Sequence, residues 1–160
     1  VKHFALNNKE TNRKNSDSRV SERAAREIYL KAFEIIVKEA KPWCIMSSYN
    51  MVNGVYANEN AHLLQEILRD DWGFDGFVVS DWGANNDFVE GVRAGSHLEM
   101  PSSGGDGPNQ LIKAVREGRI TEREVAAEAE YVMRKNGAEG LSFETISASL
   151  NRKKLPKLAA

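Results

Sequence analysis

The chain has 160 residues, of which 41% are hydrophobic and 28% charged, a composition typical of one globular domain with its own hydrophobic core. Its 22 basic and 23 acidic residues give a formal net charge of -1, and no basic stripe precedes the last ten residues, so we expect no nucleic-acid partner. No apolar run approaches the roughly 18 residues of a membrane-spanning helix, so we expect no membrane partner.

The single cysteine, Cys44, excludes an internal disulfide and a thiolate metal cluster, and it fits a buried structural thiol in a reducing, cytoplasmic compartment. No group of His, Asp and Glu residues has the spacing of metal ligands, so we expect neither a metal nor a cofactor. The chain starts at Val1, without an initiator methionine, in a stretch that looks like the end of a strand. We therefore expect a piece of a longer protein.

Strand and helix signals alternate along the chain. The expected strands are 1–4, 44–49, 77–80 and 97–101. The first two expected helices are 22–40 and one from Asn58 or Asn60 to about Trp72. A third helix passes through Phe88 and Val92 and closes at Gly95, and a fourth passes through Leu111 and Val115 and ends at Gly118. The last begins at the Thr121–Glu124 capping box and ends near Asn136. The apolar stripe expected to face the core from helix 22–40 consists of Ala25, Ile28, Tyr29, Ala32, Phe33 and Ile36.

This alternation predicts an α/β protein with parallel strands covered by helices. In such sheets the reactive side chains lie at the carboxyl ends of the strands. That rule selects four places: Lys2-His3, Met46 to Tyr49, Asp81-Trp82 and Glu99-Met100.

Together these strand ends suit a sugar. An aromatic ring can support the apolar face of the sugar, basic side chains can hydrogen-bond its hydroxyls, and Asp81 can attack the anomeric carbon or stabilise an oxocarbenium ion. Composition alone leaves alternatives open, because a strand-end Asp can also bind a metal or cap a helix.

Five stretches resemble glycoside hydrolase family 3, in the order and at the spacings of that family. They are KHFALNNKETNR from Lys2, MSSYN from Met46 with the following Asn53-Gly54, WGFDG from Trp72, SDWGA from Ser80 and LEMP from Leu98. The resemblance covers roughly residues 1 to 135. The residues after His3 fit the β-glucosidase branch better than the N-acetylglucosaminidase branch, whose Asp-His dyad is missing here.

The resemblance implies that Asp81 is the nucleophile of a retaining mechanism. It also implies sugar-binding roles at the subsite next to the cleaved bond for Lys2, His3, Arg13, Met46, Tyr49 and Trp82. Glu99 is a tempting second carboxylate, but we interpret it as structural. The expected substrate is a terminal β-D-glucoside or a short β-linked gluco-oligosaccharide.

The resemblance further implies a partial TIM-like (β/α) barrel. Residues 1–137 would form the C-terminal half of the eight-stranded catalytic barrel, and 138–160 a divergent tail that is helical or disordered. The general acid/base would be a Glu on another domain, outside this chain. Either a homodimer or the missing remainder of the enzyme would complete the barrel. The alternative function is a non-catalytic, sugar-binding or structural fragment of such a barrel.

Overall fold

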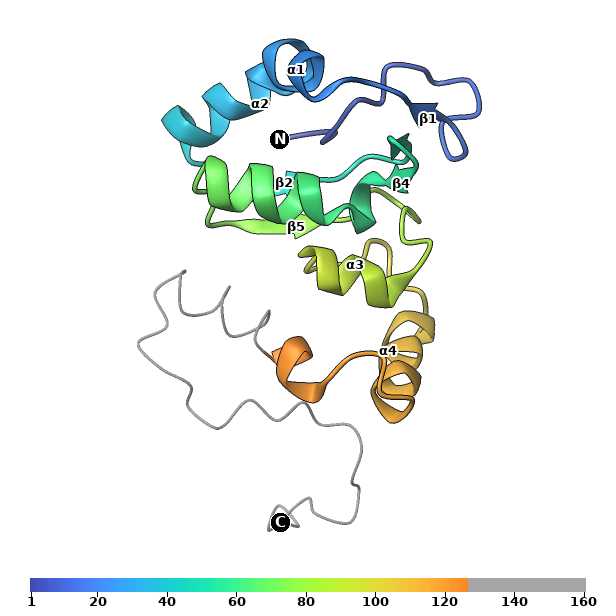
Figure 1. Ribbon diagram of the computed structural model, residues 1–160. Helices are drawn as coiled ribbons and strands as arrows, with labels where there is room; N and C mark the ends of the chain where they lie inside the picture. The colour runs from blue at the N-terminus through green and yellow to red at the C-terminus, as the bar shows by residue number, and fades with distance from the viewer. Residues whose placement is uncertain (127–160) are drawn as a thin grey trace.

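A computed structural model describes residues 1–126 of the chain (Figure 1). The tail expected at 138–160, and most of the helix expected after Thr121, lie outside the described residues. Within residues 1–126 no helix is both long enough and apolar enough to cross a membrane.

The described part of the chain alternates short strands with helices. The strands are β1 (Asp17–Ser18), β2 (Cys44–Met46), β3 (Met51–Val52), β4 (Val55–Tyr56) and β5 (Phe77–Val79). The helices are α1 (Glu22–Ala24), η1 (Ala25–Tyr29), α2 (Lys31–Ile35), η2 (Ile36–Ala40), η3 (Ala57–Glu59), η4 (His62–Asp71), α3 (Phe88–Ala94) and α4 (Asp106–Arg116). η3 is a 3₁₀ turn, whereas η1, η2 and η4 have the wider turns of a π-helix.

Four parallel segments form the centre of the fold. β2 pairs in parallel with β5. Phe4 forms a parallel bridge to Ser47 at one side of this pair, and Leu98 forms one to Val79 at the other. The order in space is therefore the order along the chain, as the alternating pattern predicts. The strands expected at 1–4 and 97–101 are present only as these single bridges.

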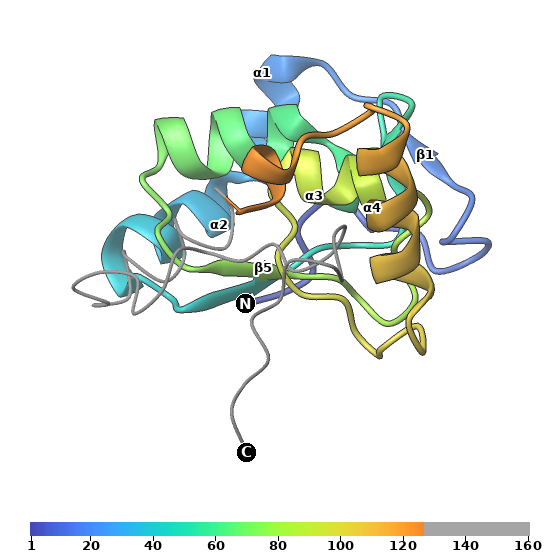
Figure 2. The ribbon, with the colours of Figure 1, turned by 90° about the horizontal axis from the view of Figure 1, so that it is seen from below.

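The helices lie along one face of the β2–β5 pair, as Figure 2 shows. η4 supplies the four apolar residues expected from the sequence, and all four are buried: Leu63, Leu64, Ile67 and Leu68. They pack with the parallel segments in one hydrophobic cluster that also contains Phe4, Ile45 and Val78. The ring of Phe4 meets Phe33 edge-on at 5.1 Å and Trp72 at 5.9 Å between ring centres.

The expected helix 22–40 is present, but the prediction of its buried face is wrong in part. Its turns widen at η1, where the N–H of Leu30 bonds to the carbonyl of Ala25 at 2.8 Å. A hydrogen bond that spans five residues widens the turn, so side chains in and after η1 depart from the 3.6-residue pattern that the stripe assumed. Leu30 is therefore completely buried, whereas Ile28 is 68% exposed and Tyr29 is also exposed. The helix ends at Lys41, directly before Pro42.

A second hydrophobic cluster joins α3 to α4 through Val89, Ala114 and Ile120. α3 ends at Gly95 in the left-handed conformation, as expected. The Thr121–Glu124 capping box is confirmed, because Glu124 N–H donates to Thr121 Oγ1 at 3.1 Å and Thr121 N–H donates to Glu124 Oε2 at 2.7 Å.

A small sheet lies in the loops that follow the parallel segments. β1 pairs in parallel with β3, and β3 pairs antiparallel with β4. Cys44 on β2 is half-buried rather than buried, and burial raises the pKa of its thiol.

Candidate active site

Asp81 stands two residues after Val79, the last residue of β5, beyond the carboxyl end of the strand. It is 8% exposed, and its Oδ1 accepts the N–H of Trp82 at 2.7 Å. A turn closes behind it, since the N–H of Ala84 bonds to the Asp81 carbonyl at 2.9 Å and Gly83 has the positive φ of 73° that the turn requires. The Gly83 N–H bonds in turn to the carbonyl of Met100 at 3.0 Å. Neighbouring backbone therefore holds Asp81 in place on one side.

His3 faces Asp81 across the parallel segments. Its Nε2 lies 3.6 Å from Asp81 Oδ2, and the carboxylate is the more buried of the two groups. The two residues are 78 positions apart in the chain, so their proximity is a property of the fold.

Tyr49 borders Asp81 on the other side. Its hydroxyl donates to the carbonyl of Trp82 at 2.8 Å. Burial raises the pKa of the Tyr49 hydroxyl, the negative charge of Asp81 raises it further, and the charge of Arg13 opposes both. The guanidinium of Arg13 lies over the Tyr49 ring at 4.6 Å and the ammonium of Lys14 at 5.3 Å. Two cations thus lie over the one aromatic ring that borders Asp81.

The structure brings most of the expected residues to this place, though not all by contact. His3, Tyr49 and Trp82 contact Asp81 or its backbone, and Arg13 reaches it through the Tyr49 ring. The indole of Trp82 is 62% exposed and is therefore free to meet a ligand.

Three expected residues are less closely tied to Asp81. Lys2 is exposed beside His3, and Met46 ends β2 half-buried. Arg13 also forms an ion pair with Glu10 at 2.6 Å.

Glu99 has a partner of its own. Its Oε2 accepts the hydroxyl of Ser103 at 2.7 Å and the Ser103 N–H at 3.4 Å. The carboxylate therefore holds the loop before α4, which agrees with the structural interpretation of this residue.

Sequence reasoning missed two groups beside the expected ones. Lys14 follows Arg13, and its ammonium lies over the same Tyr49 ring. Its position next to Arg13, a predicted sugar-binding residue, could have indicated this contact. Glu59 accepts hydrogen bonds from the backbone of the loop after Asp81, and no local sequence pattern predicts that contact.

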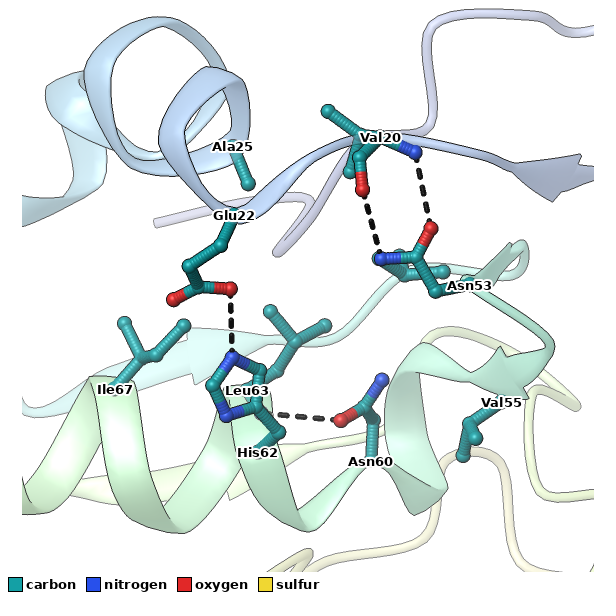
Figure 3. Close-up of a pocket in the computed structure, with 10 residues that line it drawn as sticks. Val20, Glu22, Ala25, Asn53, Val55, Asn60, His62, Leu63 and Ile67 are labelled. Atoms are coloured by element: carbon teal, nitrogen blue, oxygen red, sulfur yellow. Dashed lines mark hydrogen bonds and ion pairs between the residues drawn. The ribbon is translucent and has the colours of Figure 1, made fainter.

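A cavity of about 200 Å³ lies elsewhere, between α1, η1, η4 and the β3–β4 turn (Figure 3). Its walls are mainly apolar, and none of its lining residues is among those expected to bind the sugar. At its edge Glu22 Oε2 lies 3.0 Å from His62 Nε2, so a hydrogen bond joins two helices there. The pKa of His62 is raised by its hydrogen bonds to Glu66 and Glu22.

No group of three or more His, Cys, Asp and Glu residues within 1–126 is arranged to hold a metal ion. The candidate site offers a carboxylate, an imidazole, a phenol and an exposed indole.

Fold and site together define a class: a parallel α/β protein with a buried carboxylate at the carboxyl ends of its strands, the position that TIM-barrel enzymes use for catalysis. The chain matches the model of the glycosyl hydrolase family 3 N-terminal domain over residues 1–135. It belongs to glycoside hydrolase family 3.

Its relatives include an arabinopyranosidase and several β-glucosidases. An exo-alpha-(1->6)-L-arabinopyranosidase of Bifidobacterium longum is 56% identical over 121 residues, which are 76% of this chain and 16% of that protein. The thermostable beta-glucosidase B of Acetivibrio thermocellus is 47% identical over 134 residues, which are 84% of this chain and 18% of that protein. Among solved structures, beta-glucosidase 3B from Thermotoga neapolitana, in complex with glucose, matches with a TM-score of 0.79 and 44% identity over 83% of this chain and 20% of that one. The chain thus spans between 16% and 18% of the length of these curated relatives.

Proposed function

We propose that the chain is the part of a retaining β-glycosidase barrel that carries the nucleophile, Asp81. The observation that carries the proposal is the position of this buried carboxylate at the end of β5, with His3 Nε2 at 3.6 Å. Family membership supports it, because the β-glucosidases among the relatives match the chain across this segment.

In this reaction an oxygen of Asp81 attacks the anomeric carbon of a terminal β-glucoside. The bond from that carbon to the leaving oxygen breaks, and the leaving oxygen takes a proton from a general acid. Water then attacks the same carbon and releases Asp81. The acid/base is proposed to be a Glu on another domain, since a retaining site needs a second carboxyl about 5–5.5 Å away.

The other residues of the site would bind the sugar. His3, Lys2 and Arg13 would donate hydrogen bonds to its hydroxyls, and Tyr49 and Met46 would line the subsite. The exposed indole of Trp82 would support the apolar face of the ring.

A second substrate is a candidate because of the 56% identity with the arabinopyranosidase. An α-L-arabinopyranoside has the anomeric geometry of a β-D-glycoside, but it lacks the hydroxymethyl group and has the opposite configuration at C4. Asp81 would attack both sugars in the same way, so the choice between them depends on residues that meet C4 and C5.

The barrel itself would be completed by further strands. The segments at Phe4 and Leu98 each pair on one side only within residues 1–126, and Val1 and Leu98 expose apolar side chains there. The rest of a longer chain would supply the missing strands, or a second copy would do so in a homodimer. A folded monomer by light scattering would rule out the homodimer.

The test compares hydrolysis of 2,4-dinitrophenyl β-D-glucopyranoside and α-L-arabinopyranoside by the native chain, Asp81→Asn and Glu99→Gln. The dinitrophenolate leaves with little help from an acid, so the assay asks only about the part of the site in this chain. We expect Asp81→Asn to lose at least about a thousandfold in kcat/KM and Glu99→Gln to stay near native. A folded native chain that binds glucose without turnover would favour the alternative, a non-catalytic sugar-binding fragment.

A further inference from the structure

Two adjacent residues of η3 bind the loop that follows the proposed nucleophile. This loop runs from Asp81 to α3, and Asn58 and Glu59 contact three consecutive residues in its second half, 85–87. η3 belongs to the preceding turn of the chain, so the contact joins two loops at the same end of the parallel segments.

Glu59 binds the backbone of the loop. Its Oε1 accepts the N–H of Asn86 and the N–H of Asp87, each at 2.8 Å. Burial raises the pKa of the Glu59 carboxyl, while the two backbone hydrogen bonds act in the opposite direction. A carboxylate that is partly desolvated and accepts two N–H groups fixes both peptide planes, because charge-assisted hydrogen bonds are stronger than neutral ones.

Asn58 binds the side chains around the loop. It is completely buried, and its Oδ1 accepts the hydroxyls of Ser47 at 2.7 Å and Ser96 at 3.0 Å. Its Nδ2 donates to Asn85 Oδ1. Ser47 directly follows β2 and Ser96 directly precedes the segment of Leu98, so one amide joins the loop to both neighbours of β5.

The first half of the loop has polar anchors of its own, since the Tyr49 hydroxyl donates to the Trp82 carbonyl and the Gly83 N–H donates to the Met100 carbonyl. Ala84 is its one buried apolar side chain, and Gly83 gives it freedom of backbone rotation. At its far end Asp87 caps α3 by accepting the N–H groups of Val89 and Glu90. Polar contacts rather than packing therefore determine where the backbone after Asp81 lies.

We propose that Glu59, supported by Asn58, is a positioning residue that fixes the loop behind Asp81 and thereby speeds the covalent step of glycosyl transfer. The inference rests on the proposed function of Asp81. Glu59 does not touch the sugar; it acts through the backbone of residues 86 and 87, and a misplacement of the nucleophile by a fraction of an ångström is enough to slow attack.

The experiment uses the full chain, native and with Glu59→Ala, Glu59→Gln or Glu59→Asp, with Glu117→Ala as a control at an exposed helix end. Hydrogen–deuterium exchange reports the amides of Asn86 and Asp87 directly. The same samples react with 2,4-dinitrophenyl 2-deoxy-2-fluoro-β-D-glucoside, and released dinitrophenolate gives the covalent rate constant at saturation and the half-saturating concentration.

We expect exchange of these two amides to rise about tenfold in Glu59→Ala, the effect of losing about 1.4 kcal/mol. The covalent rate constant should fall about tenfold with little change in the half-saturating concentration. Glu59→Gln keeps an acceptor oxygen and should recover most of both. Glu59→Asp keeps the charge but shortens the side chain by one methylene, so its carboxylate no longer reaches the two N–H groups and it should behave like Glu59→Ala. It replaces Glu59→Ala in the experiment if that variant does not fold.

Exchange in Glu59→Ala and Glu59→Asp within twofold of native would overturn the inference. Faster exchange with an unchanged covalent rate constant would overturn it as well. A folded native chain that takes no sugar would instead contradict the proposed function, and exchange alone would then decide whether Glu59 holds the loop.

Discussion

The hydroxyl of Tyr49 donates a hydrogen bond to the backbone carbonyl of Trp82 at 2.8 Å. Because that carbonyl belongs to the residue after Asp81, the phenol fixes the backbone next to the carboxylate. The Tyr49 ring meanwhile holds the guanidinium of Arg13 at 4.6 Å. One side chain therefore has two separable tasks, and a substitution can remove one and leave the other.

Tyr49→Phe should remove the hydrogen bond and keep the ring under Arg13. We expect the covalent rate constant with the fluoroglucoside to fall about fivefold, the equivalent of about 1 kcal/mol for one hydrogen bond. Tyr29→Phe is the matched control, since Tyr29 lies exposed on the helix 22–40. Equal rates for both variants would show that the Trp82 carbonyl needs no such support.

Trp82→Ala should weaken sugar binding without destabilising the chain. The indole is 62% exposed, so its removal should change the free energy of unfolding by less than about 0.5 kcal/mol. The half-saturating concentration of the fluoroglucoside should rise about tenfold, as expected for a lost aromatic contact of about 1.4 kcal/mol.

Trp43→Ala provides the control for that experiment, because Trp43 is 73% exposed and directly precedes β2, away from its carboxyl end. An equal change in both variants would remove Trp82 from the sugar site.

The buried face of helix 22–40 can be tested by a pair of substitutions. Leu30→Ala should cost about 2–5 kcal/mol in urea unfolding because Leu30 is completely buried. Ile28→Ala should cost less than about 0.5 kcal/mol because Ile28 is largely exposed. The opposite ranking would restore the face expected from the sequence.

That helix also shows how far the sequence could predict the fold. Apolar spacing predicted where the helix lies and which residues of η4 are buried, since η4 presents Leu63, Leu64, Ile67 and Leu68 as expected. It could not predict the wide turn that ends at Leu30, because turn width is set by packing rather than by local propensity.

The candidate site also contains contacts that the sequence could predict and contacts that it could not. The order of the parallel segments could be predicted, and it brings His3 within 3.6 Å of Asp81. The contact of Glu59 with the backbone of residues 86 and 87 could not, because it joins two loops whose relative positions no sequence period specifies.

His62 should make stability depend on pH. Its pKa is raised in the folded chain by Glu66 and then Glu22, so its contribution is fully present below the unfolded pKa of about 6.5 and is lost as pH rises through the folded pKa. The side chain is 45% exposed, so solvent screens the pairs and the effect should be about 0.5 kcal/mol or less.

The measurement is urea unfolding of native chain and His62→Gln at pH 5.5 and pH 8.5. The native chain should be more stable than the variant at the lower pH, and the difference should shrink at the higher one. A difference that grows with pH would contradict the assignment of these ion pairs.

The most direct test of the account is to identify the carboxylate that a sugar labels. The folded chain is incubated with 2,4-dinitrophenyl 2-deoxy-2-fluoro-β-D-glucoside, digested, and analysed by peptide mass spectrometry, with Asp81→Asn in parallel. We predict one fluoroglucosyl adduct, on the peptide that contains Asp81, and none in the variant. An adduct on Glu99 or another carboxylate, or none on a folded native chain, would contradict the assignment of Asp81 as the nucleophile.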